Sequence, residues 1–234
     1  MGKPENEPVH EASYDLTKKF SFDSIEGFDD HISLHIRDYD RLGATVLALA
    51  DYFVIGGKRV YDIGCSTGKL ITALDEKYAD RKAEYVGIDV NHNFAKDFAD
   101  TPTVKFNKAD VTQGYVFSEA SLILSLFTLQ FIDPKDRLKV LDSISESLDT
   151  GYGFILAEKV YPDSANAFRI LEGGSTDHKL AHTSEAEVVK KERDIRDIMR
   201  PFEEELLVGE LNKRFRSTTT IWSCFNFRAY MCIK

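Results

Sequence analysis

The segment Val60-Tyr61-Asp62-Ile63-Gly64-Cys65-Ser66-Thr67-Gly68-Lys69-Leu70 has the pattern of a short apolar strand, a turn of small residues and the start of a helix. A backbone that turns sharply beside a ligand needs residues with little or no side chain, and Gly64, Ser66 and Gly68 meet that need. The first N–H groups of the following helix can hold an anionic group. Asp62 lies at the carboxyl end of the strand, where open α/β sheets bind their ligands.

A second apolar segment, residues 85–90, carries Asp89 at its end, about one βαβ half-unit after the turn. An acid at that place typically accepts hydrogen bonds from ribose hydroxyls. The turn differs from the dinucleotide-binding pattern, because Ser66 replaces the middle glycine and the last spacing is short. We therefore expect a nucleoside with one small anionic end, and a purely structural turn is the alternative.

Strand and helix patterns alternate along the chain. They predict strands from about 59 and at 85–90, 104–108, 121–127 and 152–157, and helices within 24–53, over 69–78 and 93–99, and from Asp133 to about 150. Such alternation is typical of a parallel, doubly wound sheet with right-handed crossovers. The β-rich segments 218–222 and 225–233, joined by a tight link at 223–224, predict a closing antiparallel hairpin.

The domain organisation follows from the same patterns. Residues 1–20 are polar and carry many charges, so we expect a flexible N-terminal leader. Residues 21–234 then form one α/β domain, long enough for a sizeable core. Between about 161 and 212 the alternation pauses, which indicates a helical insertion that acts as a lid over the strand ends. Within it, Gly173, Gly174 and Asp177 predict a loop, and Ser184 is expected to cap a long charged helix.

The chain of 234 residues carries a formal net charge of −9 at pH 7, and its sequence pI is about 5.2. This balance argues against broad binding to a phosphate backbone, and no apolar run is long enough to span a bilayer. The three cysteines, Cys65, Cys224 and Cys232, are irregularly spaced, so neither a disulfide framework nor a metal site is expected. The composition favours a cytoplasmic protein without direct nucleic-acid or membrane partners.

The sequence resembles the class I S-adenosylmethionine-dependent methyltransferases in the order of its landmarks: Asp62-x-Gly64-x-Ser66-x-Gly68, then Asp89, Asp110 and the closing hairpin. More closely, it is similar to the carboxy-S-adenosylmethionine synthases, a family of the bacterial wobble-uridine oxyacetate pathway of tRNA modification. The segments that carry this resemblance are 61–66, Phe127-Thr128-Leu129-Gln130-Phe131, Glu158-Lys159 and Trp222-x-Cys224-Phe225-Asn226-Phe227. The resemblance extends from about residue 20 to residue 234, nearly the whole chain.

The resemblance implies a Rossmann-like fold with a seven-strand, mostly parallel sheet, a homodimer, and S-adenosyl-L-methionine or its carboxylated form as the cofactor. It implies that S-adenosylmethionine and a small-molecule substrate, prephenate, give carboxy-S-adenosylmethionine and phenylpyruvate. The cofactor-binding residues that it implies are Tyr39, Asp62, Gly64, Cys65, Ser66, Asp89, Val90, Asp110, Val111 and Leu126. Arg193 would then hold the new carboxylate, because a guanidinium offers a planar, always-charged fork.

Four of these residues also have simpler interpretations. Tyr39 is either a phenol that closes over the nucleotide or a partly buried aromatic residue at the start of a helix. Asp110 either accepts a hydrogen bond from the adenine amino group or caps a turn. Cys65 fits small-residue packing better than a catalytic thiol. Arg193 lies in a mixed-charge run that is typical of a solvent-exposed helix face.

One position departs from the resemblance. The family has an asparagine immediately before the Phe-Thr-Leu-Gln-Phe segment, where this chain has Leu126. Leucine cannot donate a hydrogen bond, so a carboxylate there loses a partner worth about 1.5–3 kcal/mol. The alternatives are therefore an S-adenosylmethionine-dependent methyltransferase that acts on an unidentified small-molecule acceptor, and a non-catalytic cofactor-binding module.

Overall fold

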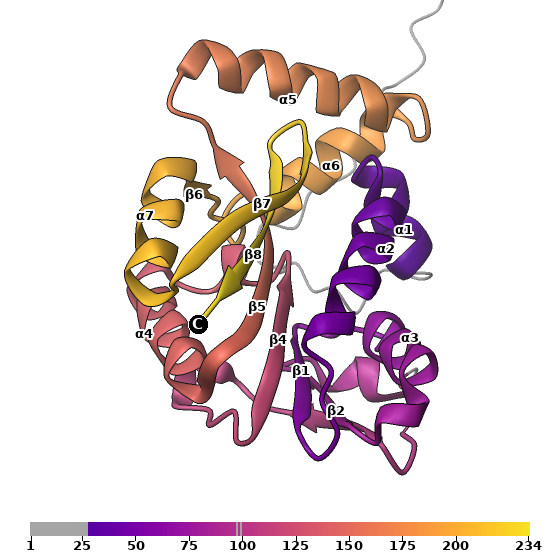
Figure 1. Ribbon diagram of the computed structural model, residues 1–234. Helices are drawn as coiled ribbons and strands as arrows, with labels where there is room; N and C mark the ends of the chain where they lie inside the picture. The colour runs from indigo at the N-terminus through magenta and orange to yellow at the C-terminus, as the bar shows by residue number, and fades with distance from the viewer. Residues whose placement is uncertain (1–27, 97, 99) are drawn as a thin grey trace, which may run out of the picture.

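The computed structural model describes residues 28–96, 98 and 100–234, so the expected leader at 1–20 lies outside the described residues (Figure 1). The strands are β1 (Arg59–Ile63), β2 (Glu84–Asp89), β3 (Val104–Lys108), β4 (Ala120–Leu126), β5 (Leu148–Tyr161), β6 (Phe202–Glu203), β7 (Ser217–Cys224) and β8 (Phe227–Ile233). The α-helices are α1 (Phe28–His35), α2 (Tyr39–Leu49), α3 (Lys69–Lys77), α4 (Pro134–Ser147), α5 (Ala165–Leu180), α6 (Glu185–Ile195) and α7 (Glu204–Arg214).

The strands form one sheet in the order β3-β2-β1-β4-β5-β8-β7, and the two-residue strand β6 pairs with the end of β5. Strands β1 to β5 are parallel, whereas β8 is antiparallel to both β5 and β7. The predicted parallel sheet with an antiparallel C-terminal hairpin is confirmed, and β6 adds one short strand to the seven expected. The strand order reverses between β1 and β4, and ligands of such sheets bind in the crevice outside the strand ends at that point.

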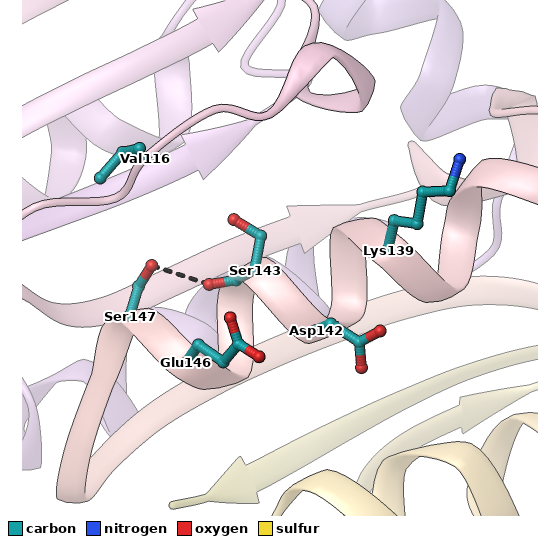
Figure 2. A pocket seen from close by; sticks show the side chains of 6 residues that line it. All are labelled: Val116, Lys139, Asp142, Ser143, Glu146 and Ser147. Atoms are coloured by element: carbon teal, nitrogen blue, oxygen red, sulfur yellow. Dashed lines mark hydrogen bonds between the residues drawn. The ribbon is translucent and has the colours of Figure 1, made fainter.

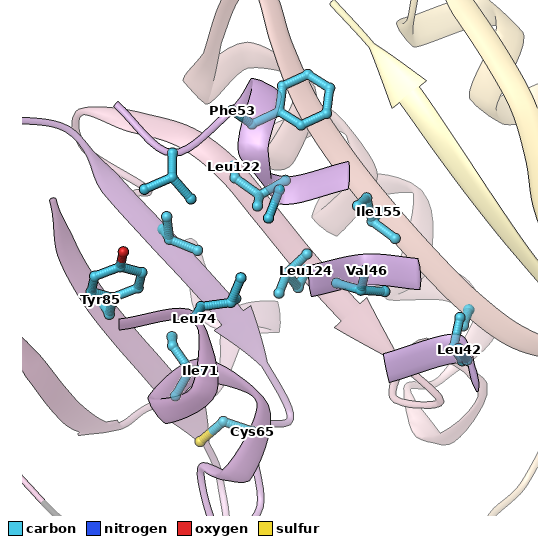
Figure 3. Packing of buried hydrophobic residues seen from close by; sticks show 14 of the residues in the cluster. Leu42, Val46, Phe53, Cys65, Ile71, Leu74, Tyr85, Leu122, Leu124 and Ile155 are labelled. Carbon is cyan, nitrogen blue, oxygen red and sulfur yellow. The ribbon is translucent and has the colours of Figure 1, made fainter. Parts of the chain in front are cut away.

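Helices cover both faces of the sheet (Figure 1). On one face, α2 and α3 pack fully buried side chains against β1, β4 and β5 (Figure 3); these include Leu42, Val46, Ile71 and Leu74. On the other face, α4 and α7 contribute the buried residues Val140, Leu141, Leu207 and Leu211. Fully burying an aliphatic side chain contributes about 1.5–3 kcal/mol, so packing on both faces fixes the strand ends in place.

The segment from 161 to 212 is mainly helical, as expected, but its internal boundaries differ from those predicted. Gly173, Gly174 and Asp177 lie inside α5 and do not form a loop. At Gly174 a Cβ would lie 2.8 Å from the ring of Phe225, so this glycine allows close packing within the helix. Ser184 caps α6 as predicted, in a capping box with Glu187. Helix α7 falls within the expected insertion, yet it packs in the core against α4 because its apolar face completes that side of the sheet.

The N-terminal helical region and residues 93–99 also differ from prediction. The first is two helices, α1 and α2, separated at Asp38, which has a positive φ of 60° and makes no side-chain cap hydrogen bond. Among the described residues of the second, the structure has only a short 3-10 turn, His92–Lys96. No helix in the described part of the chain is long and apolar enough to cross a membrane.

The last strands are longer than predicted. Strand β5 begins at Leu148 and ends at Tyr161, because it pairs with β4 on one side and with β8 on the other. The link between β7 and β8 lies at Phe225 and Asn226, where Phe225 has a positive φ of 48°, and Cys224 still pairs within the sheet. The hairpin is confirmed, but its turn lies two residues after the predicted link at 223–224. Strand β7 continues until the turn geometry at Phe225 ends it.

Candidate active site

A cleft of about 940 Å³ opens at the carboxyl ends of β1, β2 and β4 and is also lined by α2, α5 and α6. All ten residues implied to bind the cofactor line this cleft: Tyr39, Asp62, Gly64, Cys65, Ser66, Asp89, Val90, Asp110, Val111 and Leu126. Arg193 is exposed and is not among the lining residues. The fold therefore assembles the expected cofactor residues from four strand ends and one helix, but it does not bring Arg193 to them.

The turn after β1 forms the floor of the cleft. Gly64, Ser66 and Gly68 have positive φ angles of 74°, 50° and 79°. At Gly64 a Cβ would lie 2.0 Å from Thr128 Oγ1, and that hydroxyl donates a hydrogen bond to the carbonyl oxygen of Ile63 at 3.0 Å. The glycine is therefore required by its backbone conformation and by the close approach of Thr128.

Two carboxyl groups lie beside this turn. Asp89 accepts hydrogen bonds from the N–H of Ser66 at 3.1 Å and from the N–H of Asn91 at 2.9 Å, so it ties the ends of β1 and β2 together. Asp62 is 4% exposed, and burial together with the charge of Asp89 raises its pKa to about 7. Burial also raises the pKa of Asp89. Burial thus disfavours the ionised form of both acids, and a cationic ligand at the floor would stabilise that form.

Asp110 is the turn cap that one of its two interpretations predicted. It caps the 3-10 turn η5 (Val111–Gln113), where one carboxylate oxygen accepts the N–H of Thr112 at 2.9 Å and its hydroxyl at 2.7 Å. The same side chain lines the cleft. An ionised carboxylate accepts about four hydrogen bonds, so the cap leaves capacity for a ligand amino group.

Tyr39, Phe127 and Phe227 form an aromatic wall of the cleft. The ring centroids of Tyr39 and Phe127 lie 6.1 Å apart, and those of Phe127 and Phe227 lie 5.7 Å apart in an edge-to-face contact. Tyr39 begins α2, so it is a helix-entry residue whose ring also faces the cleft. Leu126 adds apolar surface at the end of β4. This wall suits a planar or apolar group of a ligand.

Cys65 belongs to the apolar core as well as to the cleft (Figure 3). The residue is 7% exposed, and burial raises the pKa of its thiol well above the usual range. A protonated thiol is a poor nucleophile. The geometry therefore favours the packing interpretation of Cys65.

A buried carboxyl group holds the loop after β4. Glu158, on β5, has no exposed surface and accepts hydrogen bonds from the N–H groups of Leu129 and Gln130, both at 2.9 Å. Gln130 in turn accepts the N–H of Lys159 through Oε1 at 3.0 Å. The Phe-Thr-Leu-Gln-Phe and Glu-Lys segments, far apart in the sequence, thus form one network that fixes a wall of the cleft.

The part of the cleft formed by β5, α5 and α6 is basic. Lys159, Lys179 and Lys191 line it, one from each element, and Lys159 Nζ lies 2.9 Å from the carboxylate of Glu172. The sequence indicated α6 as a source of positive charge through Arg193, whereas the charged residues of that helix region that line the cleft are Lys191, Glu192 and Arg196. Spacing alone did not reveal these lysines, because they are distant in the sequence and meet only through the packing of three elements.

A second, smaller hollow of about 400 Å³ is lined by residues of α4 and by Val116 on a neighbouring segment (Figure 2). Its lining residues are Val116, Lys139, Asp142, Ser143, Glu146 and Ser147. The hydroxyl of Ser147 donates to the carbonyl oxygen of Ser143 at 2.7 Å, which is a contact within one helix. The hollow therefore offers no convergent set of groups for a ligand. In the described part of the chain, no group of three or more His, Cys, Asp or Glu residues is placed to hold a metal ion.

Comparison with known proteins places this chain in a family. Residues 60–151 match the family model of a methyltransferase domain. The carboxy-S-adenosyl-L-methionine synthase of Staphylococcus epidermidis is 32% identical over 217 residues, which cover 88% of this chain and 92% of that protein. The synthase of Shewanella amazonensis is 33% identical over 227 residues, which cover 92% and 93% of the two chains.

Solved structures share the fold at lower identity. Human N-acetylserotonin methyltransferase, solved in complex with S-adenosylmethionine, matches with a TM-score of 0.56 and 16% identity over 82% of this chain and 51% of that chain. A complex of the Haloferax volcanii Trm112 activator with a methyltransferase matches with a TM-score of 0.58 and 14% identity, over 89% and 94%. The fold is thus that of S-adenosylmethionine-dependent methyltransferases, and the chain belongs to the carboxy-S-adenosyl-L-methionine synthase family.

Proposed function

We propose that this chain binds S-adenosylmethionine in the cleft and carboxylates its methyl group. This is the reaction that the name of its synthase relatives describes. The observation that supports this best is the polarity of the cleft. Two buried acids, Asp62 and Asp89, lie on its floor, and lysines line the part formed by β5, α5 and α6. A sulfonium nucleoside is cationic and suits the floor, whereas a carboxylate suits the basic part.

The residues of the floor fit such a nucleoside. Asp89 would accept the ribose hydroxyls, and Asp110 would accept the adenine amino group. Gly64, Cys65 and Ser66 would line the methionine part, where Ser66 Oγ is buried and has no hydrogen-bond partner among the described residues. Asp62 lies beside this part of the turn, so an ammonium group there would compensate its charge.

The chemistry follows from the two substrates. When bound, S-adenosylmethionine supplies a methyl group made acidic by the adjacent sulfonium, and prephenate supplies carbon dioxide. The methyl proton and the ring hydroxyl of prephenate leave together as water, so the products are carboxy-S-adenosylmethionine and phenylpyruvate. For its part, the chain would exclude solvent from the reacting carbon with Tyr39, Leu126 and Phe127, all of which line the cleft.

Mass spectrometry of the nucleoside that co-purifies with the protein tests this function without a guess about substrate. Incubation of the protein with S-adenosylmethionine and prephenate should then give a nucleoside heavier by one carbon dioxide, together with phenylpyruvate. Absence of both products, with prephenate recovered intact, would contradict the synthase reaction.

A methyltransferase that acts on a small-molecule acceptor is the second candidate. Leu126 favours it, because this apolar residue lines the cleft where the family has an asparagine, and Arg193 does not line the cleft. In that case S-adenosylhomocysteine, and no carboxylated nucleoside, should accumulate when an acceptor is supplied. A third possibility, binding without turnover, would give neither product.

We further propose, on the family resemblance, that the chain forms a homodimer in the cytoplasm and that its product is used in tRNA wobble-uridine modification. Direct contact with RNA is not part of this proposal, since the net charge of −9 disfavours it. Light scattering of the purified chain would test the homodimer, with a mass of one chain as the contrary result.

A further inference from the structure

We propose that Lys191, together with Lys179 and Lys159, forms a binding site for a carboxylate of the second small-molecule substrate. This assignment rests on the proposed function, since it names the recognition site for the partner of S-adenosylmethionine in the same cleft. The three lysines come from β5, α5 and α6, and all of them line the cleft. Lysine was not among the residues implied by the resemblance, which gave Arg193 a different task, holding the new carboxylate of the cofactor.

Two of the lysines are held against the wall of the cleft. Lys159 is 8% exposed and pairs with Glu172 at 2.9 Å, and Glu172 also accepts the side-chain amide of Asn226 at 2.8 Å. Lys179 Nζ lies 3.8 Å from a carboxylate oxygen of Glu192. The positions of these two ammonium groups are therefore fixed by partners from the same part of the fold.

Lys191 completes the cluster from α6. It is half-buried, and its pKa is lowered to about 8 by burial and then by the positive charge of Lys179. The pKa of Lys179 is itself lowered by burial and then by the charge of Lys159. Glu172 and Glu192 line the same part of the cleft and oppose this effect at Lys179. The three lysines still outnumber the two glutamates, so a carboxylate bound among them would be attracted by the excess positive charge.

The surroundings indicate what carries the carboxylate. Phe168, Ile195, Met199 and Phe227 line the same cleft, so the group next to the lysines meets apolar and aromatic surface. The cleft volume of about 940 Å³ lies near the upper end of the range for sites that bind a drug-sized molecule, which leaves room for a second small ligand. The ligand class is therefore a small carboxylic acid with an unsaturated or aromatic body.

Lysines recognise a carboxylate differently from an arginine. An ammonium is a compact point charge, whereas a guanidinium makes two parallel hydrogen bonds in a fixed plane. Leu126 adds no donor here. Arg196 also lines the cleft and would add a guanidinium to the positive charge of the lysines. A carboxylate held among these cations should lose affinity as salt is raised.

Phenylpyruvate is a suitable probe, because it can be titrated into the full-length protein saturated with S-adenosylmethionine without turnover. Lys191→Met should weaken phenylpyruvate binding at least about tenfold, the loss expected for one charged hydrogen bond, and leave the affinity for S-adenosylmethionine within about twofold. Lys191→Arg should restore most of the affinity. Lys190→Met is the matched control, because Lys190 is exposed on the same helix, pairs with Asp194 at 2.6 Å and does not line the cleft.

Three results would overturn the assignment. If the wild-type protein does not bind phenylpyruvate, the site does not exist. If Arg193→Met weakens phenylpyruvate binding and Lys191→Met does not, the carboxylate is bound by Arg193 and not by the lysines. Equal weakening of S-adenosylmethionine by Lys191→Met would show that the lysine holds the carboxylate of S-adenosylmethionine itself. Lysine-dependent phenylpyruvate binding without carboxylated product would contradict the proposed reaction and leave this site standing.

Discussion

The floor of the cleft and its basic part are built in different ways. The floor is the turn from Gly64 to Gly68 with Asp62 and Asp89, and its shape is set by backbone angles and by hydrogen bonds to main-chain N–H groups. The basic part contains Lys159, Lys179 and Lys191 from three elements, and ion pairs hold the first two. The shape of the floor therefore depends on the backbone, whereas the basic part depends on side chains, which single substitutions can change.

The sharpest test of this contrast is to replace glycine with alanine once in the floor and once in α5, the helix that carries Lys179. Gly64→Ala should destabilise the protein by about 3 kcal/mol or more, because alanine at a positive φ costs about 1–2 kcal/mol and its Cβ would collide with Thr128. Gly173→Ala in α5 should stabilise it by about 0.5–1 kcal/mol, since a Cβ there meets no atom of the described residues within 4 Å and alanine favours a helix. Chemical denaturation of both variants measures the difference, and similar effects would remove the distinction between the two regions.

The next largest effect concerns the affinity of the floor for its nucleoside. Asp89→Ala should weaken S-adenosylmethionine binding by about 100-fold or more, because two hydrogen bonds from ribose to a charged group are each worth about 1.5–3 kcal/mol. Calorimetric titration measures this affinity. Lys190→Met is the control that should bind S-adenosylmethionine normally, because Lys190 lies on α6 and does not line the cleft. An unchanged affinity in Asp89→Ala would exclude the ribose assignment.

The raised pKa of Asp62 predicts opposite pH dependences for stability and for binding. Its pKa is about 7 in the folded protein and 3.8 for an ordinary aspartate, so from about pH 4 to 7 the folded chain keeps a proton that the unfolded chain has lost. The free energy of unfolding of the ligand-free protein should therefore fall as pH rises through this window.

Binding of the cationic nucleoside should strengthen by about tenfold from pH 6 to pH 8, because Asp62 becomes ionised. Thermal melts and titrations across this range provide both measurements. Asp62→Asn should flatten both profiles, and a variant that keeps the full pH dependence would assign the titration to another group.

The smallest expected effect lies in the helices over the basic part. Ser184→Ala removes the hydroxyl that accepts the N–H of Glu187 and breaks the capping box of α6, which should cost about 1 kcal/mol. Since α6 carries Lys191, the loss should appear as faster hydrogen exchange in α6 with little change at the floor. Uniform loss of protection over the whole chain would mean that this region does not open separately.

The comparison also explains which predictions from sequence succeeded. The ten residues expected to bind the cofactor all line one cleft. Nine of them lie at or just after strand ends, which meet at one edge of a parallel sheet, and Tyr39 begins α2. Arg193 does not line the cleft whereas Lys191 does, because a difference of two residues on a helix turns a side chain to another face. Gly174 misled the prediction of a loop, because its close contact with Phe225 is invisible in the sequence.

The sequence by itself determined the strand–turn–helix from Val60 to Leu70, the alternation that gives a parallel sheet, and the acids at the strand ends. These depend on local backbone preferences and on the period of apolar residues, which neighbouring residues encode directly. Only the tertiary structure decided which cations line the cleft. It also decided that Glu158 holds the loop from Phe127 to Gln130 and that α7 packs in the core. Those features depend on the packing of elements distant in the chain, and packing is set by the shapes of all partners together.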